Sequence, residues 1–157
     1  YSHFFRVYGM VEKGARHADK MMEKIGWAYW RDGWNFCNFE ETPEKNFCGP
    51  LWTGEMHNSL FLDEIEKILN EKDLRKSREI YQILRIWKEE QNLPILFYET
   101  SYIAKEIKAK QPKISEIINN LRLMDYKAGR THLSKCAFKT DASYREIKSI
   151  FKAKPKN

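Results

Sequence analysis

Five side chains able to donate to phosphate oxygens fall within thirteen residues near the C-terminal end of the sequence. They are Lys127, Arg130, His132, Lys135 and Lys139. Lys and Arg donate to phosphate, Arg through two parallel N–H groups, and His can donate to phosphate or stack on a base. Their spacing suits a two-stranded hairpin, in which alternate side chains share a face. Lys113 extends the same patch, so the sequence predicts a surface that binds a polyanion.

Charge is distributed unevenly along the 157 residues. Residues 101–157 carry fourteen Lys and Arg against five Asp and Glu, a net charge of +9, whereas residues 1–100 carry −3. A basic segment of this kind attracts a polyanion, because each phosphate contact releases counterions and the electric field steers association. A Lys-rich surface that is merely solvated gives the same count, so charge alone leaves both interpretations open.

Residues for enzymatic chemistry are not grouped in the sequence. The four histidines are scattered without HExxH spacing, and the sequence holds no Gly-rich phosphate or cofactor loop. The adjacent pair Glu89-Glu90 is interpreted as solvated surface rather than as an acid/base dyad. Cys37 and Cys48 are separated by ten residues and have no CxxC partners, a weak indication of zinc, since a closed site needs four ligands. We therefore expect no catalytic, cofactor-binding or metal-binding residue in this chain.

The first hundred residues predict both strands and helices. Period-2 alternation over residues 2–12 is typical of a strand. Asp32-Gly33 between aromatic residues predicts a hairpin, and a further extended segment is expected near Phe47–Trp52. Apolar residues at helical spacing then predict two amphipathic helices, through Leu60–Leu69 and across Arg75–Gln91.

The C-terminal third predicts the order helix, turn, helix, basic hairpin, helix. Its expected elements are helices at Ser101–Lys110 and Ile114–Met124, a hairpin of Lys127–Leu133 and Cys136–Thr140, and a last helix. Thr140 or Asp141 is expected to cap that last helix. This is the order of a winged helix, in which the second helix and the hairpin, or wing, can both meet nucleic acid.

The predicted fold class is α+β, with a small mixed or antiparallel sheet and helices, followed by a winged-helix-like C-terminal unit. Two regions are expected, an α+β region with an aromatic-rich hairpin at residues 1–95 and a basic unit at residues 96–157. Every apolar run is shorter than the roughly 20 residues that span a bilayer, so we expect no membrane partner. Three cysteines are a sparse, odd set, which indicates a reducing, cytoplasmic setting.

Three segments of the sequence resemble one family, in the same order. SHFFRVYGMVEKGARHADK at Ser2–Lys20 is similar to the segment that follows the catalytic domain in tRNA (guanine-26-N2)-dimethyltransferases. CGPLWTGEMHN at Cys48–Asn58 resembles the family's GPLW-G stretch. RTHLSKCAFKTDA at Arg130–Ala142 resembles its RTH…KTDA segment, with the same spacing. Together they cover nearly the whole chain, whose lysine- and isoleucine-rich composition resembles archaeal members.

The resemblance implies a parent enzyme that uses S-adenosylmethionine to methylate the exocyclic N2 of a guanine in tRNA. It also implies that the methyl-donor site and the catalytic acidic motif belong to a Rossmann-like domain upstream, so this chain alone is expected to be inactive. A start at Tyr1 rather than Met is expected of a fragment. The chain would bind tRNA, as a monomer, and position it for the catalytic domain of the same protein. The expected RNA-binding residues are Lys113, Lys127, Arg130, His132, Lys135 and Lys139.

The GPLW segment has a structural role in this interpretation. Gly49-Pro50 would form a turn followed by a buried Trp52. Many family members carry two CxxC pairs just before this segment, which resemble a zinc ribbon. Here only Cys37 and Cys48 remain, so packed Trp and Phe side chains are expected to stabilise the hairpin in place of zinc.

Two interpretations from other classes remain beside tRNA binding. A winged-helix DNA-binding regulator would read bases with polar residues of its second helix, and that helix offers Ser115, Asn119, Asn120 and Arg122. A structural domain would instead use its basic face to dock on another protein.

Overall fold

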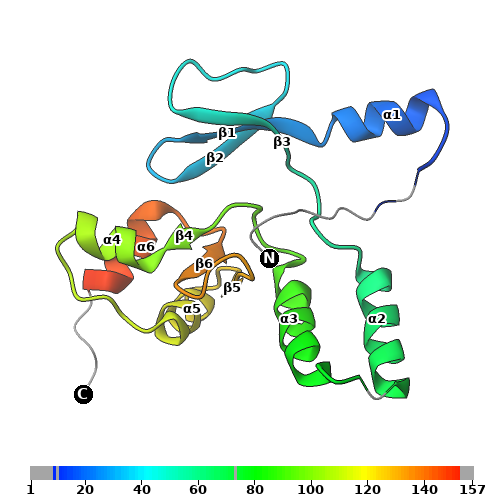
Figure 1. Ribbon diagram of the computed structural model, residues 1–157. Coiled ribbons are helices and arrows are strands. Elements are labelled where there is room, and N and C mark those ends of the chain that lie inside the picture. Colours follow the sequence, from blue (N-terminus) through cyan, green and yellow to red (C-terminus); the bar gives the residue numbers. More distant parts are fainter. Residues whose placement is uncertain (1–8, 10, 73, 153–157) are drawn as a thin grey trace. The chain divides into compact units, whose positions relative to one another are not determined.

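The computed structural model describes residue 9, residues 11–72 and residues 74–152 (Figure 1). They divide into two compact units. The first unit includes the described residues up to Tyr29 together with Phe36–Thr53, and the second includes Trp30–Asn35 and the described residues from Gly54 onward. The strand predicted over residues 2–12 lies mostly outside the described residues. Residue 9 and residues 11–13 are not part of a strand.

The first unit contains one helix and most of a three-stranded sheet, whose hairpin turn and adjoining strand ends (Trp30–Asn35) belong to the second unit. Its elements are α1 (Ala15–Met22), β1 (Ile25–Trp30), β2 (Trp34–Asn38) and β3 (Phe47–Trp52), with the strands in the order β2-β1-β3. The turn between β1 and β2 places Asp32 at φ 51° and Gly33 at φ 121°, the left-handed region that Asp and Gly tolerate best. The hairpin and the extended segment predicted from the sequence are both confirmed.

Aromatic packing around Trp27 stabilises this sheet. The indole ring stacks on Phe39 at 5.9 Å between ring centroids and meets Phe47 edge-on at 5.3 Å. Its Nε1 donates to the carbonyl oxygen of Phe39 at 2.9 Å. Trp52, expected to be buried, is only partly buried because it ends β3, an edge strand. The ammonium of Lys24 lies 5.6 Å from the centroid of the Trp52 ring.

The second unit begins with two amphipathic helices, α2 (Ser59–Glu71) and α3 (Ser77–Glu90). Leu62, Leu69 and Leu84 are buried at their contact. The side chain of Asn58 caps α2 by accepting from the backbone N–H of Phe61 at 3.0 Å. Both predicted amphipathic helices are confirmed.

The remainder of the second unit follows the predicted order of helices and strands. Its elements are β4 (Tyr98–Glu99), α4 (Thr100–Glu106), α5 (Ile114–Leu123), β5 (Ala128–Arg130), β6 (Ala137–Thr140) and α6 (Tyr144–Lys152). The strands form an antiparallel sheet in the order β4-β6-β5. Helices α5 and α6 pack on β6 around Ile117, Leu121, Phe138 and Ile147, which are fully buried. The prediction of a mixed α and β fold with small antiparallel sheets is confirmed.

The N-terminal cap of α6 differs from the predicted one. Ser143 Oγ accepts from the N–H of Glu146 at 3.3 Å, and the Glu146 carboxylate accepts from the N–H of Ser143 at 3.0 Å. This reciprocal pair is a capping box. Asp141 instead accepts from the N–H of Lys127 at 2.9 Å and so joins the two strands at the open end of the hairpin. Thr140 accepts from the N–H of Ala142.

Among the described residues, no helix is both long enough and apolar enough to cross a bilayer.

Candidate nucleic-acid interface and the buried Glu90 cluster

Five of the six predicted RNA-binding residues are exposed on the second unit, and four of them are Lys or Arg. Lys127 precedes β5, Arg130 ends it, Lys135 lies in the connection to β6, and Lys113 is at the N-cap of α5. A chain of hydrogen bonds brings the last two segments together. Gln111 Nε2 donates to Thr100 Oγ1 at 2.6 Å, and Thr100 Oγ1 donates to the carbonyl oxygen of Cys136 at 2.9 Å.

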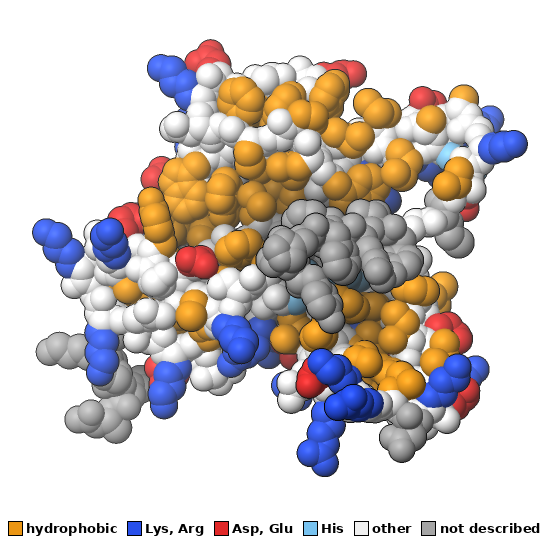
Figure 2. Space-filling model, viewed as in Figure 1, with side chains coloured by type: hydrophobic (Ala, Val, Ile, Leu, Met, Phe, Trp, Pro, Cys, Tyr) orange, Lys and Arg blue, Asp and Glu red, His pale blue; other side chains and the backbone are white. Residues whose placement is uncertain are grey.

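These exposed cations therefore divide between the two ends of the β5–β6 hairpin. Lys113, Arg130 and Lys135 belong to the end that carries the connection between the strands. Lys127 lies three residues before Arg130, roughly 10 Å back along the strand. On the face that Figure 2 shows, Lys and Arg side chains project into solvent at several separate places. A long polyanion that follows the hairpin could contact both ends, whereas a small anion could not.

Lys139 is not part of this exposed surface, contrary to the prediction. Its side chain is 1% exposed, and its Nζ lies 3.4 Å from Oε1 of Glu90, the last residue of α3. Lys139 pairs across the hairpin with Gly129. A Cβ at Gly129 would come within 2.7 Å of Leu93 Cδ1, so the segment around the end of α3 covers this face of the hairpin. The buried ion pair removes Lys139 from the phosphate-contact candidates.

His132 is exposed as a residue, but its Nδ1 is directed at Glu90. Its Nδ1 lies 2.5 Å from Glu90 Oε2, and its backbone N–H donates to Glu90 Oε1 at 3.2 Å. The imidazole retains 26% side-chain exposure. With Glu90 occupying Nδ1, the contact with RNA expected of His132 would be limited to the exposed edge of the ring.

Glu90 lies between Lys139 and His132, and its burial was not predicted from the sequence. Glu89 is exposed as expected, but Glu90 is 2% exposed, and its carboxylate also lies 3.4 Å from Nε2 of His57. Burial by itself raises the pKa of Glu90. Hydrogen bonds from His132 and Thr131 and the charge of Lys139 outweigh burial and lower this pKa to about 2. The carboxylate therefore stays ionised throughout the physiological range.

The histidines that meet at Glu90 come from distant parts of the sequence. His57 lies before α2, and His132 lies in the β5–β6 connection. The ring of His57 stacks on Trp87 at 5.4 Å, and burial lowers the pKa of His57 below its usual value. No spacing rule joins the two histidines. One local signal existed, because Leu84, Trp87 and Glu90 follow one another at helical spacing and place Glu90 on the buried stripe of α3.

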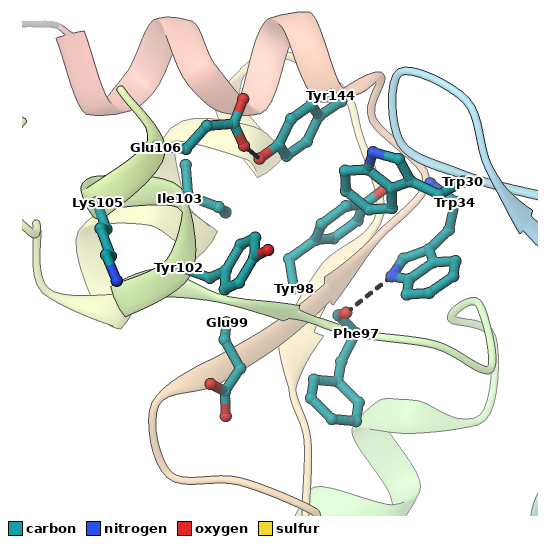
Figure 3. Close-up of a pocket in the computed structure, with 10 residues that line it drawn as sticks. All are labelled: Trp30, Trp34, Phe97, Tyr98, Glu99, Tyr102, Ile103, Lys105, Glu106 and Tyr144. Carbon is teal, nitrogen blue, oxygen red and sulfur yellow. Dashed lines mark hydrogen bonds between the residues drawn. The ribbon is translucent and has the colours of Figure 1, made fainter. Parts of the chain in front are cut away.

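A separate aromatic pocket lies beside β4 and α4 (Figure 3), with a volume of about 840 Å³. It is lined by Trp30, Trp34, Phe97, Tyr98, Glu99, Tyr102, Ile103, Lys105, Glu106 and Tyr144. Trp34 Nε1 donates to the carbonyl oxygen of Phe97 at 3.1 Å, and the Tyr144 hydroxyl donates to the Glu106 carboxylate. Trp30 meets Tyr144 edge-on at 4.9 Å. Trp30 and Trp34 belong to the second unit, so these contacts are internal to that unit.

The chain is similar to tRNA-modifying enzymes over most of its length. A family model described as N2,N2-dimethylguanosine tRNA methyltransferase matches residues 1–152. The tRNA (guanine(26)-N(2))-dimethyltransferase of Pyrococcus abyssi is 33% identical over 151 residues, which are 94% of this chain and 40% of that protein. The enzyme of the same name from Methanocaldococcus jannaschii is 33% identical over 147 residues, 92% of this chain and 39% of that protein.

A solved structure has the same fold. It is the complex of Trm1 from Pyrococcus horikoshii with S-adenosyl-L-methionine, and it superimposes with a TM-score of 0.79 at 29% identity, over 88% of this chain and 38% of that one. This chain thus spans about 40% of the length of the curated relatives it matches. Because the family model covers nearly all of its residues, the chain belongs to the N2,N2-dimethylguanosine tRNA methyltransferase family.

Proposed function

We propose that this chain is the tRNA-binding part of an enzyme that transfers a methyl group from S-adenosylmethionine to N2 of a guanine in tRNA. The observation that carries the proposal is the family match over residues 1–152. Relatives matched over the same region are named for dimethylation at guanine 26, and the solved neighbour is a complex with the methyl donor. We assign the donor site to the part of the protein that this chain does not span.

The proposed RNA-binding element is the winged-helix-like arrangement within the second unit. Two helices, α4 and α5, are followed by the β5–β6 hairpin in a sheet of order β4-β6-β5. In winged helices the second helix and the wing meet nucleic acid. We therefore propose that the basic unit expected at residues 96–157 binds the RNA.

Phosphate contacts are the proposed mode of recognition. A-form RNA hides the edges of its bases in a deep, narrow major groove, so a protein that holds a folded tRNA reads mainly its backbone and shape. Lys113, Lys127, Arg130 and Lys135 are exposed and can donate to phosphates without losing a buried partner. By holding the tRNA, they would position it for the catalytic domain of the same protein.

A binding comparison tests this proposal. The 157-residue chain is titrated, at low and at moderate salt, into fluorescently labelled tRNA and into a DNA duplex with a similar number of phosphates. We expect the tRNA to bind more tightly and its affinity to fall with salt, because backbone contacts release counterions. Equal or tighter binding to the duplex would contradict the proposal in favour of a DNA-binding regulator. Absence of binding to either at low salt would favour a domain that docks on protein.

A further inference from the structure

We propose that His57, Glu90 and His132 form a binding site for a divalent transition-metal ion. One ligand atom from each, His57 Nε2, a Glu90 carboxylate oxygen and His132 Nδ1, lies within 4.8 Å of the other two. Two imidazoles and a carboxylate are a ligand set that zinc and related ions use in proteins. Lys113, Lys127, Arg130 and Lys135, the exposed cations assigned to RNA contact, are not among these ligands, whereas His132 also belongs to the predicted RNA-binding set.

The distances within the cluster are close to those of a metal site. A tetrahedral ion with ligands at about 2.0–2.2 Å holds neighbouring ligand atoms roughly 3.3–3.6 Å apart. His57 Nε2 and Glu90 Oε2 are already 3.4 Å apart. His132 Nδ1 and Glu90 Oε2 are 2.5 Å apart, the length of a hydrogen bond, and must separate by about 1 Å. Metal binding therefore replaces the shared proton with an ion.

The mobility needed for this change lies in the histidines. The Glu90 side chain is fully buried, whereas the side chains of His57 and His132 are 15% and 26% exposed. An ion can therefore enter from the solvent side while the carboxylate stays in place. Solvent would supply the remaining ligand, as in zinc sites with three protein ligands and one open position.

Surrounding groups orient the proposed ligands. Glu90 Oε1 accepts from the backbone N–H of His132 and lies 3.4 Å from Lys139 Nζ, which leaves Oε2 for the ion. Trp87 fixes the ring of His57 by stacking, and its own Nε1 is buried without a hydrogen-bond partner among the described residues. Partners that hold metal ligands in place commonly change metal affinity by about 10–100-fold.

The ligand set selects the class of ion. Calcium and magnesium need several oxygen ligands, and this cluster offers one carboxylate. The neighbouring Lys139 ammonium also disfavours an ion that is held by charge alone. Imidazole nitrogen suits zinc, nickel, copper and cobalt, so zinc and cobalt are appropriate probes.

Calorimetric titration of the metal-stripped, full 157-residue chain with zinc tests the site. The three free cysteines, Cys37, Cys48 and Cys136, are replaced by serine in the parent so that thiols do not bind the probe. We expect one zinc ion per chain. His57→Ala and His132→Ala should each weaken binding by about tenfold or more. His17→Ala, which removes an exposed histidine of α1, is the matched control and should not change the affinity.

Cobalt spectra and thermal melting test whether the metal binds at His57 rather than elsewhere on the chain. In the parent, cobalt should give the ligand-field bands of a nitrogen and oxygen site, and zinc should raise the melting temperature. At a metal concentration that just saturates the parent, both effects should be much weaker in His57→Ala and in the milder His57→Gln, whose melting without metal confirms that they fold. Zinc binding that is absent from the parent, or that both His57 variants retain unchanged, would overturn the proposal.

Discussion

Lys139 and Glu90 form an ion pair inside the protein, with Nζ 3.4 Å from Oε1 and both side chains at most 1% exposed. The pair joins β6 to the end of α3, and its two residues are 49 positions apart in the sequence. A buried ion pair contributes little net stability against an apolar replacement, because both charges lose their hydration. Removing one partner is different, since it leaves the other charge buried without compensation.

Lys139→Met should therefore lower the free energy of unfolding by about 3–5 kcal/mol. The methionine keeps most of the apolar stem, so the loss reports the missing positive charge beside the buried Glu90 carboxylate, which keeps its contacts with His132. Urea unfolding followed by circular dichroism measures it. Lys135→Met on the exposed connection is the matched control and should stay within about 0.5 kcal/mol. Equal, small losses in both variants would show that Lys139 is solvated.

Stability should fall as the solution becomes acidic, in two steps. The folded protein holds the pKa of Glu90 at about 2, below its ordinary value of 4.5, through the hydrogen bonds and charge that outweigh burial. The unfolded chain then takes up the proton first, so stability present above pH 4.5 is lost towards pH 2. This loss is on the order of 3 kcal/mol. Burial lowers the pKa of His57, which adds a loss beginning below about 6.5.

Urea unfolding at a series of pH values, with a chelator present, measures both steps. Glu90→Gln should flatten the dependence between pH 4.5 and 2. Glu89→Gln, the exposed neighbour on the same helix, should leave it unchanged. If Glu89→Gln flattened the curve as much as Glu90→Gln, the acid dependence would not come from the buried carboxylate.

Local patterns in the sequence predicted most of the helices and strands. Helical spacing located α2 and α3, and the Asp32-Gly33 pair located the β1–β2 turn, because these elements are determined by neighbours in the chain. The α6 cap was assigned to the wrong residue. Asp, Thr and Ser all cap helices, and only the geometry distinguished Ser143 from Asp141.

The candidate site was harder to predict, because its key contacts join distant elements. Lys139 and Arg130 are both basic residues of one hairpin, yet α3 covers the face of Lys139 and leaves Arg130 exposed. The adjacent pair Glu89-Glu90 predicted that both carboxylates would be solvated, which is wrong for Glu90. Its place three residues after Trp87 indicated a buried position, but nothing in the sequence indicated that Lys139, His57 and His132 would meet there.

The α6 cap gives a prediction about local stability. Ser143→Ala should lower the free energy of unfolding by about 1 kcal/mol, because it removes the side-chain half of the capping box with Glu146. Thermal melting measures this loss. Ser149→Ala, on the exposed part of the same helix, is the matched control and should cost less than about 0.5 kcal/mol. A larger loss in Ser149→Ala than in Ser143→Ala would contradict the assigned cap.

The exposed cations of the hairpin should carry the salt dependence of tRNA binding. Arg130→Ala and Lys135→Ala should each weaken binding and reduce the slope of log affinity against log salt by about 0.7–0.9, the contribution of one phosphate contact. Both side chains are exposed, so the melting temperature should change little. Fluorescence titrations at four salt concentrations measure the slope.

Two control variants separate phosphate contact from general charge and from folding. Lys72→Ala removes an exposed cation at the end of α2 and should leave the slope unchanged. Lys139→Met, studied well below its melting temperature, should also keep the slope, because its ammonium is paired with Glu90. If Lys139→Met reduced the slope while Arg130→Ala did not, the buried residue would be the RNA contact, and the hairpin would have to open to bind tRNA.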